Sequence, residues 1–164
     1  MIAELPADLR VVRYDEPEIL GLIDELAEEE RQRYGDGDAY SHEPESYAAP
    51  HGCFLAAVRD GREVACAGYR AAGDGVVEVK RMYVQPTSRR RGLARRLLAA
   101  LEDAAAARGA RAVRLETGRR QPEAIALYET SGYTQIPNYG EFEDDPWSVC
   151  FEKRLAPASG SAGG

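Results

Sequence analysis

Cysteine, lysine and long apolar runs are all scarce in this sequence. No stretch approaches the roughly 20 consecutive apolar residues that span a bilayer, so we expect no membrane segment. The N-terminal residues lack a basic segment followed by an apolar one, which argues against a secretory signal and favours a cytoplasmic protein. The three cysteines lie far apart in apolar, strand-like runs. This spacing argues against a disulfide framework or a zinc site and predicts buried thiols.

Positive charge is also in short supply. The 21 basic residues stand against 28 acidic ones, and the net charge of -7 argues against general affinity for nucleic acids. Only Lys80 and Lys153 are lysines, so the position of the arginines carries more information than their number. The length suits one domain, expected over residues 1–155. The tail APASGSAGG, residues 156–164, buries too little to fold and is expected to be disordered.

Hydrophobic periodicity predicts a mixture of strands and helices. A hairpin is expected around Asp60–Gly61, a dipeptide that favours a primed turn. Strands are expected over 9–14, 53–71 (this hairpin), 75–84, 111–117 and 147–155, and helices over 16–35, 92–108 and 121–132. Residues 36–52 lack periodicity and predict a long loop or short broken helices. Because hairpins precede a strand–helix–strand crossover, we expect an α/β fold: a mixed, mostly antiparallel, twisted central sheet with helices on both faces.

The segment RRRGLA, residues 89–94, stands at the start of the helix expected over 92–108. The first amides of a helix have no intrahelical partner, and the helix dipole is positive there, so a phosphate gains several hydrogen bonds. Gly92 and Ala94 allow close approach to the main chain, and arginines add charge-assisted contacts. The segment lacks the lysine of a P-loop and the three glycines of a dinucleotide fingerprint. It predicts an anion site, the alternative being a solvated charge cluster.

RRRGLA also fits the R/Q-x-x-G-x-G/A signature of the GNAT superfamily of acyl-CoA-dependent N-acetyltransferases. The longer segments MYVQPTSRRRGLARRLL and LETGRRQPEAIALYETSGYTQI resemble that family's strand–loop–helix motif and its next strand and helix. The resemblance covers roughly residues 9–155 and is sharpest over 76–135. It implies a GNAT-like domain that moves an acetyl group from acetyl-CoA directly to a primary amine.

The resemblance further implies how coenzyme A is held. In the family the loop amides bind the pyrophosphate, and the preceding strand pairs with the pantetheine arm. Gln121 stands where the family often has an asparagine near the pantetheine, a departure that moves the amide by one methylene. The implied cofactor-binding residues are Met82, Tyr83, Val84, Arg89, Arg90, Arg91, Gly92, Leu93, Ala94 and Gln121. No metal is implied.

Two residues are implied to be catalytic. Tyr128, in ALYETSGY, matches the tyrosine that the family uses to protonate the departing thiolate; the alternative is a packed tyrosine with its hydroxyl at the surface. Glu78 lies eleven residues before Arg89, where some members place a glutamate that takes the amine proton. The alternative is an ordinary charge paired with Lys80 or Arg81.

Other candidates favour structural roles. Glu116, in LETG, could face the acceptor, but pairing with the neighbours of Arg114 is the preferred interpretation. His42 and His51 lie in the long loop without further ligands at metal-site spacing, so both are expected at the surface.

The acceptor is predicted only as a class. In the family it often lies under the first helix and its loop, here 16–52, and the loop before the last strand. Both are acidic here, and an acidic rim attracts cationic amines, which favours a small-molecule or amino-acid-like amine. An amine of a protein is the alternative acceptor. A homodimer is an open alternative for the oligomeric state. A non-catalytic acyl-CoA sensor is the alternative from another class.

Overall fold

The chain forms one seven-stranded sheet with helices on both faces. A computed structural model describes residues 5–35 and 43–157. The strands are β1 (Leu9–Val11), β2 (Gly52–Arg59), β3 (Arg62–Gly73), β4 (Val76–Val84), β5 (Ala112–Gly118), β6 (Thr134–Ile136) and β7 (Ser148–Arg154). The helices are α1 (Pro17–Tyr34), α2 (Leu93–Ala107) and α3 (Pro122–Thr130), with short 3₁₀ turns η1 (Pro44–Tyr47), η2 (Pro86–Ser88) and η3 (Gly140–Phe142).

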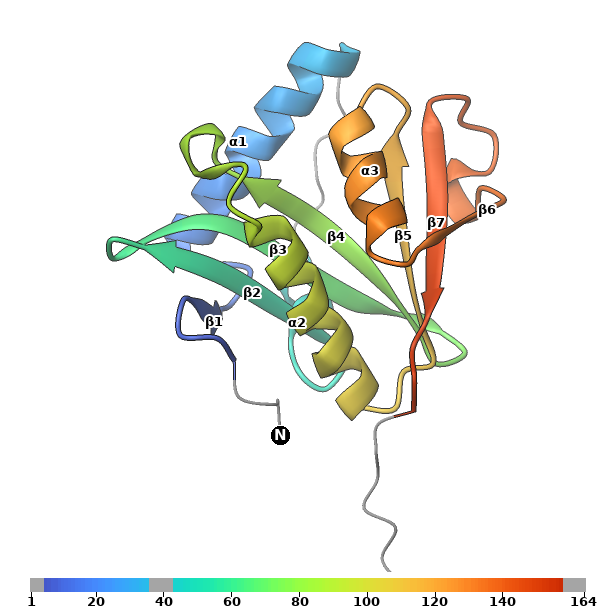
Figure 1. Cartoon of the computed structure of the whole chain (residues 1–164), viewed down its shortest axis with the longest axis horizontal. Helices are drawn as coiled ribbons and strands as arrows, with labels where there is room; N and C mark the ends of the chain where they lie inside the picture. Colours follow the sequence, from blue (N-terminus) through green and yellow to red (C-terminus); the bar gives the residue numbers. More distant parts are fainter. Residues whose placement is uncertain (1–4, 36–42, 158–164) are drawn as a thin grey trace, which may run out of the picture.

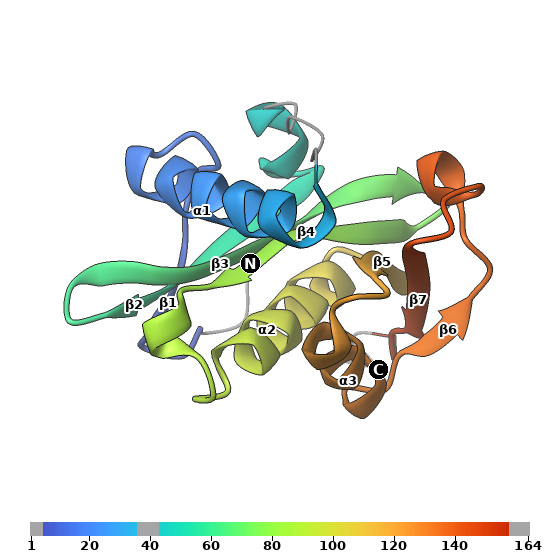
Figure 2. The ribbon, with the colours of Figure 1, turned by 90° about the horizontal axis from the view of Figure 1, so that it is seen from above.

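The strand order is β1-β2-β3-β4-β5-β7-β6, and every neighbouring pair is antiparallel except the parallel pair β4–β5. Helix α1 and turn η1 cover one face, and α2 and α3 cover the other (Figure 1 and Figure 2). The expected mixed, mostly antiparallel sheet with helices on both faces is therefore confirmed.

Alternation along the central strands divides the core in two. On β2, Cys53 and Leu55 belong to the cluster under α2 and α3, whereas Phe54 and Ala56 belong to the cluster under α1. Strands buried on both faces read as continuous apolar runs, which is why residues 53–58 show no polar alternation. All three cysteines are buried and free, as predicted.

Strands β4 and β5 pair over only three residues. The last pair is Glu78 with Arg114, and beyond it the two strands diverge (Figure 1). In the part of β4 that follows Glu78, Arg81 has a φ of 60°. Arg81 and Met82 together stand opposite the single residue Ala67 of β3, which makes a β-bulge. Such a bulge bends its strand, so the C-terminal half of β4 turns away from β5. This divergence places the candidate site.

Two details of the predicted strands need correction. The first strand ends at Val11 and not at 14, because the chain already turns toward α1, where the Arg13 N–H donates to Glu16. The short edge strand β6 was not predicted, since its three residues are too few to show a period. The hairpin turn is confirmed, with φ of 51° at Asp60 and 75° at Gly61. The predicted tail 156–164 lies largely outside the described residues.

Candidate active site

The start of α2 presents an open backbone. Gly92, the residue before the helix, has a φ of 75°, and Arg90 has a φ of 64°. No side chain caps this helix, and within the described ranges the N–H groups of residues 90–95 donate no hydrogen bond. A Cβ atom built on Gly92 would meet nothing within 4 Å. The loop therefore exposes several donors together with the positive end of a helix dipole.

The arginines of the loop divide into two groups. Arg89 is half-buried and bound to the protein: its Nε donates to the Val84 carbonyl at 2.8 Å, and its Nη2 donates to Glu29 at 2.8 Å. It fastens the loop to β4 and α1. Arg90 and Arg91 are exposed and extend from the loop. Charge available to a ligand here comes from these two side chains.

The other predicted cofactor residues border the divergence of β4 and β5. Met82 and Val84 pack against the core under α2 and α3, whereas Tyr83 is buried on the α1 face. Leu93 is buried at the start of α2, and Ala94 is partly exposed beside it. The Gln121 N–H donates to the Gly118 carbonyl at 3.0 Å just before α3.

Tyr128 is buried on α3, with 5% of its surface exposed. Its ring packs against Tyr133 and Phe151, so the aromatic part of the side chain lies in the core. Burial raises the pKa of Tyr128, and the negative charge of Glu116 raises it further. The phenol is therefore protonated at neutral pH, which is the form that a proton donor needs.

Glu78 is buried at the point where β4 and β5 part, and both of its oxygens are occupied. Oε1 accepts from Arg70 at 3.2 Å and lies 3.8 Å from Lys80 Nζ, while Oε2 accepts from the Tyr139 hydroxyl at 2.8 Å. Lys80 is one of the two partners expected from the sequence. Arg70 and Tyr139 were not foreseen, because strand pairing and the loop before β7 bring them here.

Glu116 lies two residues beyond Arg114 on β5, where β5 is no longer paired with β4. Arg114 pairs with Glu152 at 2.7 Å, and Glu116 instead accepts a hydrogen bond from Ser148 at 2.9 Å. Burial raises the pKa of Glu116 to about 7, against the lowering effects of Ser148 and Lys80. A carboxyl group with this pKa exchanges protons readily near neutral pH. Glu116 is thus a stronger site candidate than the sequence indicated.

Replacing Glu116 with glutamine is expected to stabilise the protein more at pH 8 than at pH 5. In the wild type, folding raises the pKa of Glu116 from about 4.5 to about 7. Between these pH values the unfolded chain loses the proton while the folded protein keeps it, so stability falls as the pH rises. The free energy of unfolding of the variant minus that of the wild type should increase by on the order of 1–3 kcal/mol from pH 5 to pH 8. Urea unfolding of both proteins measures this; an equal difference at both pH values would contradict it.

The acidic rim is partly neutralised. Glu141 lies 3.6 Å from Lys80, whose ammonium also stands 4.9 Å from the centre of the Phe142 ring. His51 is exposed, as expected, and His42 lies outside the described residues. Among residues 5–35 and 43–157 no cluster of three His, Cys, Asp or Glu side chains suits a metal, and no helix could span a membrane.

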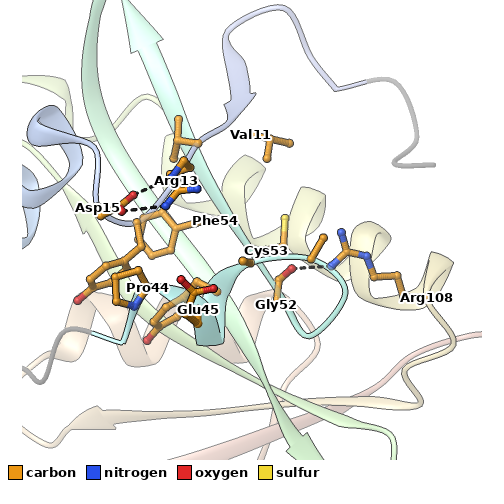
Figure 3. A pocket seen from close by; sticks show the side chains of 14 residues that line it. Val11, Arg13, Asp15, Pro44, Glu45, Gly52, Cys53, Phe54 and Arg108 are labelled. Carbon is orange, nitrogen blue, oxygen red and sulfur yellow. Dashed lines mark hydrogen bonds and ion pairs between the residues drawn. The ribbon is translucent and has the colours of Figure 1, made fainter.

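A cavity of about 180 Å³ lies elsewhere, between β1, β2 and η1 (Figure 3). Three of its charged side chains have partners within the chain: Arg13 pairs with Asp15 at 2.9 Å, and Arg108 donates to the Gly52 carbonyl at 2.6 Å. None of the predicted site residues lines it. This cavity therefore lies apart from the candidate site residues.

Comparison with known proteins defines the class. The model of the acetyltransferase (GNAT) family matches residues 18–133. The chain therefore belongs to the GNAT acetyltransferase family and is an acyltransferase, as the motifs implied. This family uses acetyl-CoA.

Individual relatives support the same assignment. The IAA acetyltransferase of Azospirillum brasilense is 41% identical over 134 residues, which cover 77% of this chain and 87% of the relative. A Klebsiella pneumoniae crystal structure assigned as an acyl-CoA N-acyltransferase is 32% identical, with a TM-score of 0.77 over 90% of this chain and 97% of its own. An N-acetyltransferase from Thermoplasma acidophilum in complex with coenzyme A has a TM-score of 0.68 over 90% of this chain and 99% of its own. At 17% identity, that likeness shows the fold alone.

Proposed function

We propose that this enzyme transfers the acetyl group of acetyl-CoA directly to the primary amine of a small molecule or amino-acid-like acceptor. The observation that carries the proposal is the divergence of β4 and β5. On one side of the sheet lie the open amides of the 90–94 loop and the Tyr128 phenol. On the other side lie the carboxylates of Glu78 and Glu116.

The residues present fit coenzyme A. The unpaired N–H groups at the start of α2 suit the pyrophosphate, and the absence of a side chain at Gly92 permits its approach. Among the described residues, no strand pairs with the β5 side of β4 beyond Glu78, so the backbone of Met82–Val84 is available to the amides of the pantetheine arm. Arg90 and Arg91 supply charge, and Gln121 lies at the start of α3.

The chemistry follows from this arrangement. Acetyl-CoA supplies an activated thioester, and an alkyl ammonium must lose a proton before its nitrogen can attack. A buried carboxylate on the α1 face takes that proton. A backbone N–H of residues 82–84 stabilises the oxyanion, and the Tyr128 hydroxyl protonates the thiolate as the carbon–sulfur bond breaks.

The charges around the acceptor side favour a cationic amine. The carboxylates of Glu30 and Asp145 both act on Glu116, and Lys80 is largely offset by Glu78 and Glu141. The name of the Azospirillum relative supports acetyl transfer. We expect the acceptor to lie under α1 and the loop before β7, and the space under these two segments to limit its size.

Calorimetric titration with acetyl-CoA, followed by a free-thiol assay across an amine panel, tests this function. We expect saturable binding and amine-dependent thiol release, with small primary amines giving higher kcat/KM than peptides offering an N-terminal or lysine amine. Release with peptides alone would move the acceptor class to proteins. Binding without release from any amine would indicate a sensor and overturn the proposal.

A further inference from the structure

A single serine hydroxyl bridges two carboxylates beside the candidate site. Ser148 Oγ lies 2.9 Å from Glu116 Oε1 and 3.1 Å from Asp145 Oδ2. Ser148 is buried, with 2% of its surface exposed, and Asp145 is exposed to solvent. The three groups therefore form a line from the interior of the site to water.

The Asp145 carboxylate is held in place for this contact. Its Oδ1 accepts from the Trp147 N–H at 2.8 Å, which leaves Oδ2 facing Ser148. The Asn138 side-chain amide binds the main-chain carbonyls of Asp145 and Ser148 at 3.1 and 3.2 Å. The loop before β7 thus fixes both ends of the serine–aspartate contact.

The bridge has two arrangements that differ by the position of one proton. A hydroxyl has one hydrogen and two acceptor lone pairs, so Ser148 can donate to only one carboxylate at a time. With Glu116 ionised, it donates to Glu116. With Glu116 protonated, the carboxyl donates to Ser148, and the serine hydrogen turns to Asp145.

Acetyl transfer releases one proton that has to leave the site. An ammonium and a thioester yield an amide, a thiol and one proton, because the nitrogen loses two hydrogens and the sulfur gains one. We propose that Glu116, Ser148 and Asp145 carry this proton to solvent, an inference that rests on the proposed function. Glu116 takes the proton from the ammonium, and the freed amine attacks the thioester. The Glu116 carboxyl group then turns its protonated oxygen toward Ser148 and passes the proton to Ser148 Oγ as Ser148 gives its own to Asp145. The second proton of the nitrogen goes to Tyr128, which has given its own to the sulfur.

Glu78 is the less suitable proton acceptor of the two carboxylates. Its Oε1 accepts from Arg70 and its Oε2 from Tyr139, and Lys80 lies beside it. An arriving ammonium would have to displace these donors. Among the described residues, Glu116 accepts a hydrogen bond from Ser148 alone, through Oε1, so its Oε2 is the oxygen available to the amine.

Charged and titratable groups act on Glu116 from every side, and a pH profile has to allow for them. Those facing it are Lys80 on β4, Glu30 on α1, Asp145 in the loop before β7, Cys150 on β7, Tyr128 on α3 and Tyr139 in the same loop. Burial raises the pKa of Glu116 to about 7, which places its own titration near neutral pH.

The first test follows the Glu116 carboxyl carbon by NMR in cofactor-free protein labelled with ¹³C glutamate, assigned with Glu116→Gln. Ser148→Ala removes a hydrogen bond to the carboxylate, so the Glu116 titration should move to higher pH by roughly half a pH unit or more. Ser148→Thr, which keeps the hydroxyl, should restore it. An unchanged titration in Ser148→Ala would overturn the proposal.

The second test is the pH profile of kcat in the thiol assay. Ser148→Ala and Asp145→Asn should each lower the plateau above pH 8 by about tenfold or more, whereas Ser148→Thr and the exposed neighbour Asp144→Asn should not. If Asp145 acted only through its charge, Asp145→Asn would move the profile to lower pH with the plateau intact, which would overturn the chain. Absence of thiol release by the wild type overturns the proposed function itself, so the two failures are distinguishable.

Discussion

Replacing Tyr128 with phenylalanine is expected to lower kcat for acetyl transfer by about 100-fold or more. The change removes one hydroxyl from a side chain that is otherwise fully packed against Tyr133 and Phe151, so the aromatic cluster keeps its shape. Without the phenol, the coenzyme A thiolate has to leave unprotonated. The Kd for acetyl-CoA should stay within about twofold, because the hydroxyl is proposed to act on the leaving sulfur and not on the phosphates.

Tyr133→Phe is the matched control. Tyr133 belongs to the same cluster, but its hydroxyl donates to Glu102 at 2.9 Å, on α2. Its loss should lower the free energy of unfolding by about 1 kcal/mol and leave kcat nearly unchanged. Stopped-flow or steady-state thiol release and urea unfolding measure both quantities. Equal turnover in Tyr128→Phe and wild type would show that another group or water protonates the thiolate.

Most of the fold could be predicted from the sequence because its elements are long and their signals are local. The Asp60–Gly61 turn and the apolar spacing of α2 each depend on a few neighbouring residues. The bulge at Arg81 and the separation of β4 from β5 were not predicted, since they depend on which strands become neighbours. No single-residue preference encodes an arginine with a φ of 60°.

The candidate site was only half visible for the same reason. Tyr128 and the RRRGLA loop are contiguous motifs, but the partners of Glu78 come from β3 and the loop before β7. The spacing of Ser148 and Cys150 was one available signal, because residues two apart on a strand lie on the same face. In the observed register Cys150 pairs with Glu116, so that face of β7 lies beside Glu116. Using it required the antiparallel pairing of β5 with β7, which periodicity alone does not provide.

Glu116 shows why the neighbouring residues in the sequence can hide the role of a side chain in a site. A carboxyl on a strand next to an arginine is usually a paired surface charge, and the sequence favours that interpretation. The structure pairs Arg114 with Glu152 and leaves Glu116 partly buried against a neutral hydroxyl. Burial that its polar and charged neighbours offset only in part makes the ionised carboxylate costly to stability above pH 7. Such a cost is typical of a carboxyl group that takes part in chemistry.

Replacing Gly92 with valine is expected to raise the Kd for acetyl-CoA by about 10- to 100-fold, equivalent to about 1.4–2.8 kcal/mol. A Cβ atom added at Gly92 meets no protein atom within 4 Å, so the protein leaves room for the side chain and the added bulk faces a ligand on the loop. A β-branched residue also resists the φ of 75° found at Gly92, which tilts the donors at the start of α2 out of alignment. Calorimetric titration with acetyl-CoA measures the loss.

Gly73→Val separates strain from ligand contact. Gly73 has a φ of 86°, its added Cβ also meets nothing within 4 Å, and it lies at the end of β3 that is remote from the 90–94 loop. Both variants should lose about 1–3 kcal/mol of stability through backbone strain, but only Gly92→Val should weaken binding. If both variants bound acetyl-CoA as tightly as the wild type, the pyrophosphate would lie elsewhere, and the arginines of RRRGLA would be a solvated cluster at a helix start.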